Sequence, residues 1–190
     1  MTDVDLADVV EAPEAAFRRD LGDALAPLSE PDALASYLVR NPDAYERLLE
    51  RMATLDDPAE FAAEAPETVD RFLAVLWSGI EIATTTLPPV EQAVTMDTSV
   101  NWTATDSPVA FHATADATAG TVAGGPGLLE DPEVTFEGRT DVLFAMLGDE
   151  SFNAPLAYIQ NRYEVIGPLE RARAFDEMMD EVRASMESMV

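Results

Sequence analysis

The first 86 residues have apolar positions at the spacing of helices. Apolar side chains recur three or four positions apart from Glu14 to Leu28, which predicts a helix there. Because proline is tolerated in the first turn of a helix, several prolines mark further helix starts, one of them after Asn41 as the N-cap. Four more helices are predicted to begin at Pro31, Pro42, Pro58 and Pro66. Residues 1–12 are acidic and weakly patterned, and we expect them to be frayed.

The pattern changes after residues 87–89, where apolar and polar residues begin to alternate. Alternation between Val94 and Ala123 predicts three strands, and residues 133–137 and 162–166 predict a fourth and a fifth. Glycines at 124, 125 and 127 predict a flexible connection between strands. Helical spacing returns from Thr140 to Gly148, from Ala154 to Gln160, and after Pro168. The fold class is therefore α+β, with a helical N-terminal region at 1–87 and a second region at 88–190.

The charge of the chain is strongly and evenly negative. It has 37 acidic residues and 11 basic residues, all arginine, for a net charge of −26. Residues 1–90 carry 19 of the acidic residues and residues 91–190 carry 18, so the negative charge is not concentrated in an acidic tail. Salt at 1 M shortens the screening length to about 3 Å and removes most of this self-repulsion. We therefore expect an acidic, halophilic protein of archaeal origin.

Three further features bear on location and partners. The first residues show no basic region followed by an apolar run, and cysteine is absent, which favours the cytoplasm. The longest apolar stretch, residues 72–82, is shorter than the roughly 20 residues of a membrane span. An evenly acidic surface is unsuited to nucleic acid, because phosphate backbones require a basic face.

Signatures of catalysis and metal binding are largely missing. The single histidine, His112, is predicted on the outer face of a strand, where a polar strand residue is the simpler interpretation. With one histidine and no cysteine, the usual zinc sites are excluded, and no serine lies in a G-x-S-x-G elbow. The chain is therefore expected not to be an enzyme, and no metal or cofactor is expected.

The residues from Val134 to Gly167 resemble the sterol carrier protein type 2 domain. They read VTFEGRTDVLFAMLGDESFNAPLAYIQNRYEVIG. Thr135 matches the strand threonine of that family, Asp141 and Gly148 match the helix aspartate and its closing glycine, and Gly167 matches the glycine that ends the last strand. The segment before that strand matches at Asn153, Ala157, Tyr158 and Gln160, and the strand itself at Arg162, Tyr163 and Val165. Asn161 departs from the pattern, because glycine is usual there, although asparagine also tolerates left-handed backbone angles.

The resemblance covers roughly residues 88–188 and implies a five-stranded sheet with helices on one face and an apolar tunnel between them. The expected lining of this tunnel, which would serve equally as a packed core, is Phe111, Phe136, Leu143, Phe144, Leu147, Leu156, Ile159, Phe175 and Met179. The methionines of the last helix, Met178, Met179, Met186 and Met189, suit either an adaptable pocket or a core. The family's lysines are absent, and only Arg139 and Arg162 remain to meet an anionic headgroup, so a neutral ligand is favoured.

Three functions follow from this sequence. The first is a non-catalytic lipid-binding or lipid-carrier protein that holds a lipid or another long apolar molecule. The second is an accessory subunit for an enzyme of lipid or quinone metabolism, with the N-terminal helices as the surface for the partner enzyme or for a homodimer. The third is a self-associating structural protein that uses the long helix around Trp77.

Overall fold

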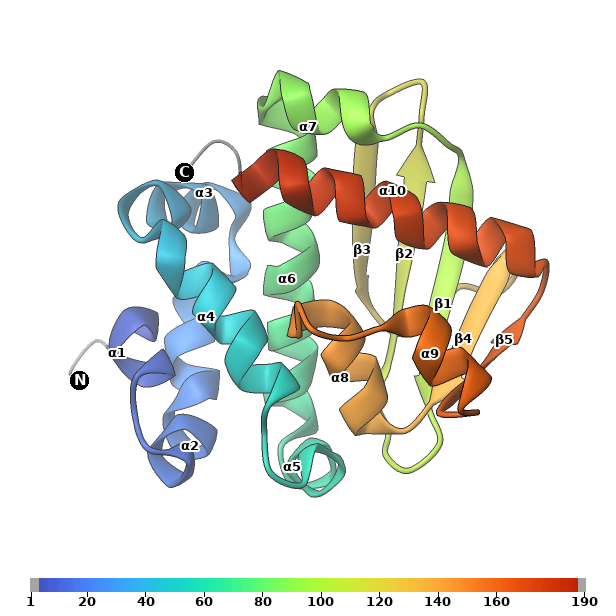
Figure 1. Cartoon of the computed structure of the whole chain (residues 1–190). Coiled ribbons are helices and arrows are strands. Elements are labelled where there is room, and N and C mark those ends of the chain that lie inside the picture. The colour runs from blue at the N-terminus through green and yellow to red at the C-terminus, as the bar shows by residue number, and fades with distance from the viewer. Residues whose placement is uncertain (1–3, 188–190) are drawn as a thin grey trace.

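All the helices lie on one side of a five-stranded sheet in the computed structural model, which describes residues 4–187 (Figure 1). The strands are β1 (Thr98–Ala104), β2 (Ala110–Asp116), β3 (Thr121–Pro126), β4 (Val134–Gly138) and β5 (Tyr163–Ile166). Their order is β3-β2-β1-β4-β5, in which β1 and β4 are parallel and the other neighbours are antiparallel. This arrangement confirms the predicted α+β class, with helices on one face of the sheet.

The N-terminal half is helical throughout its described length, as its apolar spacing predicts. Its elements are α1 (Leu6–Val10), α2 (Glu14–Leu25), the 3-10 helix η1 (Ala26–Ser29), α3 (Pro31–Arg40), α4 (Pro42–Ala53), α5 (Pro58–Glu64), α6 (Pro66–Thr86) and α7 (Pro88–Ala93). The four predicted helix starts are confirmed, since α3, α4, α5 and α6 each begin at a proline. The short helix α7, which also begins at a proline, was not predicted.

The expectation of a frayed N-terminus is wrong for the part that the structure describes. Residues 6–10 form α1, whose side chains Leu6, Val9 and Val10 are buried. The side chain of Asp5 accepts a hydrogen bond from the Ala7 backbone N–H at 3.0 Å, and the Tyr37 hydroxyl donates to the same carboxylate at 2.7 Å. A cap and a tertiary contact therefore stabilise a helix that is too short for its apolar spacing to show. Residues 1–3 lie outside the described range.

The glycines at 124 and 125 are also placed differently from the prediction. They belong to β3, where Gly124 pairs with Ala113 and Gly125 pairs with His112 of β2. The turn between β2 and β3 lies earlier and includes Gly120, which has a φ of 66°. Glycine carries no side chain to reveal alternation, so the pattern predicted a third strand here but not its continuation through these glycines.

The three remaining helices lie between or after the later strands. They are α8 (Thr140–Gly148), α9 (Ala154–Ile159) and α10 (Leu169–Glu187). The link between α9 and β5 contains Asn161 with a φ of 55°, which confirms that asparagine takes the left-handed conformation there. Helix α10 then passes back across the helical face of the sheet (Figure 1). Met189, part of its predicted apolar stripe, lies outside the described residues.

Helix α6 connects the two predicted regions, because it lies along β3 at one edge of the sheet (Figure 1). Buried residues from both halves of the chain form one continuous hydrophobic core. Trp77 of α6 is part of this core and only 1 % exposed, so it does not present a surface for self-association. The boundary at residue 87 stays a prediction, but α6 contributes to the layer in which a ligand is expected.

Candidate apolar-ligand site

The nine residues predicted to line a tunnel fall into three groups. Five are buried: Phe111, Phe136, Leu143, Phe144 and Phe175. Leu147 of α8 and Met179 of α10 are partly buried against the same core. Leu156 and Ile159 of α9 lie on the surface, 49 % and 74 % exposed. The structure therefore places most of the predicted lining in the hydrophobic core and places Leu156 and Ile159 at the surface, while their role as a ligand lining stays a prediction.

Trp102 of β1 stands at the centre of the layer in which a ligand is expected. Its ring stacks on Phe111 of β2 at 4.9 Å and on Phe136 of β4 at 5.6 Å between ring centroids. On the helical side, Phe175 of α10 and Trp77 of α6 each lie 5.7 Å from it. Offset and tilted aromatic pairs at these distances stabilise the fold by more than the burial of their apolar surface alone. Aromatic rings from five elements thus fill the space in which the tunnel was expected.

The aromatic contacts continue from this centre to the surface of the protein. Phe136 lies 5.9 Å from Tyr163 of β5, and Tyr163 lies 5.7 Å from Tyr158 of α9, which is 38 % exposed. We call the five residues Tyr158, Tyr163, Phe136, Trp102 and Trp77 the aromatic row. The Tyr163 hydroxyl donates to the Ala154 carbonyl oxygen at 3.1 Å, and burial raises the pKa of Tyr163 to about 12. The aromatic row joins the exposed edge of the sheet to its buried centre.

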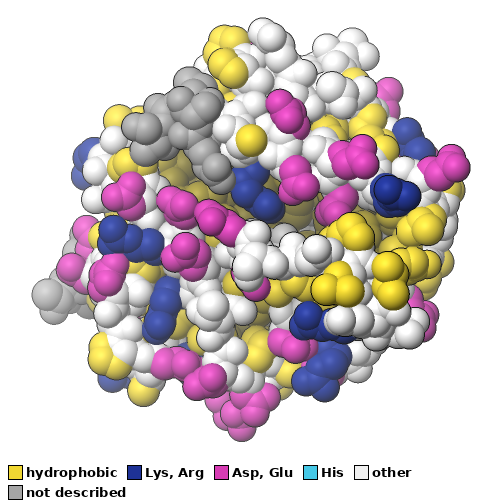
Figure 2. Space-filling view, in the orientation of Figure 1, with side chains coloured by type: hydrophobic (Ala, Val, Ile, Leu, Met, Phe, Trp, Pro, Cys, Tyr) yellow, Lys and Arg dark blue, Asp and Glu magenta, His cyan; other side chains and the backbone are white. Residues whose placement is uncertain are grey.

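The outer end of the aromatic row lies in an apolar patch. Among residues 4–187, five of the seven large hydrophobic side chains that are exposed come from the segment 156–169. They are Leu156, Tyr158, Ile159, Ile166 and Leu169, which we call the edge patch. Figure 2 shows the hydrophobic side chains that gather over α9 and its surroundings. Exposed apolar side chains gathered in one segment of a protein this acidic indicate a contact surface.

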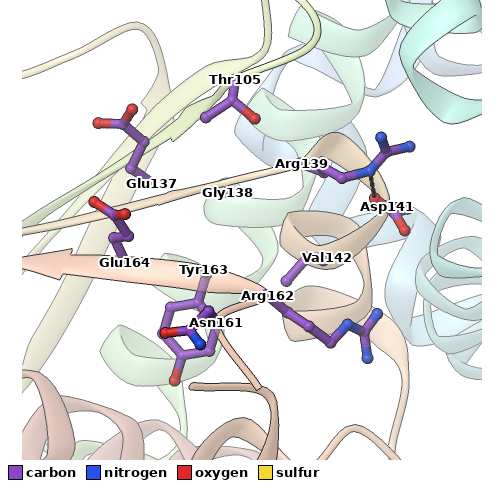
Figure 3. Close-up of a pocket in the computed structure, with 10 residues that line it drawn as sticks. All are labelled: Thr105, Glu137, Gly138, Arg139, Asp141, Val142, Asn161, Arg162, Tyr163 and Glu164. Carbon is purple, nitrogen blue, oxygen red and sulfur yellow. Dashed lines mark hydrogen bonds and ion pairs between the residues drawn. The ribbon is translucent and has the colours of Figure 1, made fainter. Parts of the chain in front are cut away.

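A polar hollow of about 440 Å³ lies beside the edge patch, where β4 ends and β5 begins (Figure 3). Its lining residues are Thr105, Glu137, Gly138, Arg139, Asp141, Val142, Asn161, Arg162, Tyr163 and Glu164. The two arginines that could meet an anionic headgroup, Arg139 and Arg162, are therefore both at this hollow. The side chain of Arg139 is already paired with Asp141 at 3.1 Å and Asp106 at 3.6 Å.

Carboxylates offset the positive charge of the two arginines in the polar hollow. Glu137 and Glu164 are directly opposite each other on β4 and β5, an arrangement in which like charges are unfavourable. Arg162 lies over the ring of Phe152, 5.8 Å from its centroid. Because the hollow contains three carboxylates and two arginines, its charge is poorly suited to a phosphate.

The residues with catalytic or metal-binding chemistry are not brought together. Nδ1 of His112 lies 3.0 Å from the Gly127 carbonyl oxygen, so the ring is engaged with backbone on the open side of the sheet. In the described part of the chain, no group of three or more histidine, cysteine, aspartate or glutamate side chains is placed to hold a metal ion. Within the same part, no helix is long and apolar enough to cross a membrane.

Two residues of the layer escaped the sequence reasoning. Trp102 alternates correctly with its neighbours on β1 but was not assigned to the lining, and Trp77 belongs to a region for which no ligand role was expected. The available signal was the size of these two side chains, since they are the only tryptophans of the chain. Their pairing across the layer depends on α6 packing against β3, which local patterns do not show.

Comparison with known proteins gives weak likenesses. No family model and no curated protein matches the chain. Among solved structures, a "UbiJ-SCP2 Ubiquinone synthesis protein" matches with 12 % identity and a TM-score of 0.46, over 58 % of this chain and 94 % of that one. The sec-alkylsulfatase Pisa1 from Pseudomonas sp. matches with 16 % identity and a TM-score of 0.44, over 91 % of this chain but 31 % of the enzyme. At these scores the likenesses assign neither a family nor an activity, and sterol carrier protein membership stays a prediction.

Proposed function

We propose that this protein is a non-catalytic carrier that holds a lipid, or another long apolar molecule, between the sheet and the helices. The observation that carries the proposal is the aromatic row, which leads from the exposed edge patch to Trp102 at the centre of the layer. Each buried methylene group contributes about 0.8 kcal/mol, so a long chain needs few polar contacts to bind.

Admission of a ligand requires movement in the layer, because aromatic rings fill it. Phe175 and Trp77 both cover Trp102 from the helical side, and because the Trp77 ring lies close against β3, a shift of α10 with Phe175 is the simpler route. Met178 is buried on α10 and Met179 is partly buried beside it, and methionine adapts readily to a changed neighbour. The predicted lining residues Leu143, Phe144 and Leu147 of α8 would form the opposite wall.

A neutral headgroup fits the proposed site better than an anionic one. The chain has no lysine, and both arginines near the entrance face carboxylates in the polar hollow. An anion brought there would meet Glu137, Glu164 and Asp141 as well as the arginines. Fatty alcohols, esters, ketones and quinones are therefore the favoured ligand classes, and phosphates are disfavoured.

An accessory role beside an enzyme of lipid or quinone metabolism is the second candidate. The edge patch favours it, because β5 is an edge strand of the sheet and its surroundings are apolar. The N-terminal helices were the predicted partner surface, and Val39, 85 % exposed, is the large apolar side chain that they present within the described range. The edge patch is the stronger partner surface of the two.

The two roles are distinguished by what purifies with the protein. We expect native mass spectrometry of protein prepared in molar salt to show a lipid adduct that organic extraction removes. A folded protein that carries no adduct and binds no added long-chain alcohol would contradict the carrier role. Co-purification of a biosynthetic enzyme that is lost in Ile159→Ser, and retained in the control Val39→Ser, would favour the accessory role.

The location and source are also proposed. An even net charge of −26 supports a protein adapted to molar salt in the cytoplasm of a halophilic archaeon. Figure 2 shows carboxylates spread over the visible face of the molecule, as such adaptation requires.

A further inference from the structure

Trp77 carries a buried hydrogen-bond donor without a partner. Its side chain is 1 % exposed, and among the described residues nothing accepts a hydrogen bond from its indole Nε1. Buried polar groups are nearly always paired, since an unmade hydrogen bond leaves the desolvation of the donor uncompensated. A donor kept in this state next to Trp102 is explained by a partner that arrives with a ligand.

The position of the Trp77 ring is fixed by the sheet. A Cβ atom added at Gly124 of β3 would lie 2.7 Å from the nearest atom of the Trp77 ring and 2.4 Å from the His112 carbonyl oxygen. The ring therefore lies against the backbone of β3, which only glycine permits. Its other neighbour is Trp102, with 5.7 Å between the ring centroids. Because the ring is held between two elements, it cannot turn to find an acceptor elsewhere.

The surroundings of Trp77 select the chemistry of that acceptor. The buried polar residues of the described chain are Thr84, Thr98, Asn101 and Thr140, and none carries a charge. A carboxylate or phosphate drawn into this layer would lack a counter-ion, which makes its burial unfavourable. An indole N–H donates and cannot accept, so it selects a ligand oxygen with a free lone pair.

Building on the proposed carrier function, we propose that the Trp77 indole N–H is the polar anchor of the site and that the ligand is a long apolar molecule with a neutral carbonyl oxygen. The chain of such a ligand would lie along the aromatic row, and its carbonyl would accept the hydrogen bond at the inner end. In this proposal α6 takes part in ligand selection. It does so although the resemblance to sterol carrier proteins covers only roughly residues 88–188, which follow α6 in the sequence.

Three ten-carbon probes test this assignment: decan-2-one, decane and decanoate. We expect the wild-type protein to bind decan-2-one about tenfold more tightly than decane, the factor that corresponds to one hydrogen bond to a buried donor, and decanoate least. In Trp77→Phe, which keeps a ring but removes the N–H, the preference for the ketone over the alkane disappears. The control Tyr45→Phe removes a buried hydroxyl beside α6 that is bonded to the Leu76 carbonyl oxygen, and it keeps the preference.

Nuclear magnetic resonance gives a second readout, because the chain has only two indole N–H groups. The Trp77 signal, identified by its loss in Trp77→Phe, is expected to move downfield with decan-2-one and not with decane. Equal binding of ketone and alkane, or a ketone preference that survives in Trp77→Phe, would overturn the anchor while leaving the carrier function intact. If none of the probes binds to the wild-type protein, the carrier function itself fails.

Discussion

Replacement of Gly124 by alanine tests the packing of α6 on the sheet. The added Cβ would lie 2.4 Å from the His112 carbonyl oxygen and 2.7 Å from the Trp77 ring, and the first of these atoms is backbone that cannot move aside cheaply. Overpacking of a core destabilises the folded state by up to about 3 kcal/mol. Alanine also lowers the conformational entropy of the unfolded chain relative to glycine, which offsets about 0.5 kcal/mol of this loss. We expect Gly124→Ala to lower the free energy of unfolding by roughly 2 kcal/mol, which lowers the Tm by about 4–8 °C in a chain of this size.

Gly125→Ala is the matched control for this substitution. The neighbouring glycine belongs to the same strand, but the nearest atom to an added Cβ there is Cε1 of His112, at 3.9 Å. We expect this variant to be neutral or more stable by about 0.5 kcal/mol. Thermal unfolding of both variants in molar salt measures the difference. Equal stability of the two variants would refute the close approach of Trp77 to β3.

Three further predictions concern charge. Neighbouring side chains partly remove water from Asp176 and Asp180 repels its charge, which together raise the pKa of Asp176 to about 6. Its ionised form therefore opposes folding above that pH, and the penalty fades as the pH falls from about 6 to about 4. Because solvent still reaches the side chain and screens its charge, Asp176→Asn should be more stable at pH 7 by less than about 1 kcal/mol, and an equal gain in Asp131→Asn would refute the assignment. Arg171 donates two hydrogen bonds of 2.6 and 2.8 Å to Glu133 and lowers the pKa of that carboxyl, and it also donates to the Asp97 carbonyl oxygen. Arg171→Gln should lower the Tm at neutral pH, and the loss should shrink as the pH falls and Glu133 gains a proton, whereas a loss that does not change with pH would assign the effect to the contact with Asp97. Salt raised from about 0.1 M to about 1 M shortens the screening length from about 10 Å to about 3 Å, so the urea midpoint should rise, and a constant midpoint would contradict halophilic adaptation.

Apolar spacing predicted most of the fold because most elements carry a buried face. Helix α6 and strand β1 each present large side chains at their own period, and the prolines mark where helices begin. Prediction failed where the stabilising contact is distant or carries no side chain. Helix α1 depends on Asp5 and Tyr37, which are 32 positions apart, and β3 contains two adjacent glycines.

The candidate site was predictable only in part. The resemblance assigned Phe111 and Phe136 to the lining, and both are buried. The same reasoning could not tell that Leu156 and Ile159 of α9 face solvent, because a six-residue helix shows too few turns to define a face. The pairing of Trp77 with Trp102 joins residues from different predicted regions, so only the tertiary structure reveals it.

Fluorescence quenching by a brominated chain reports whether a ligand lies between the sheet and the helices. Bromine quenches indole fluorescence on near contact, and both tryptophans of the protein lie in the aromatic row. We expect 6-bromododecan-1-ol, whose mid-chain bromine would lie beside Trp102 when the hydroxyl is at Trp77, to quench the emission saturably, and dodecan-1-ol to compete without quenching. Binding of the brominated alcohol that leaves the emission unchanged would place the ligand elsewhere and contradict a site between the sheet and the helices.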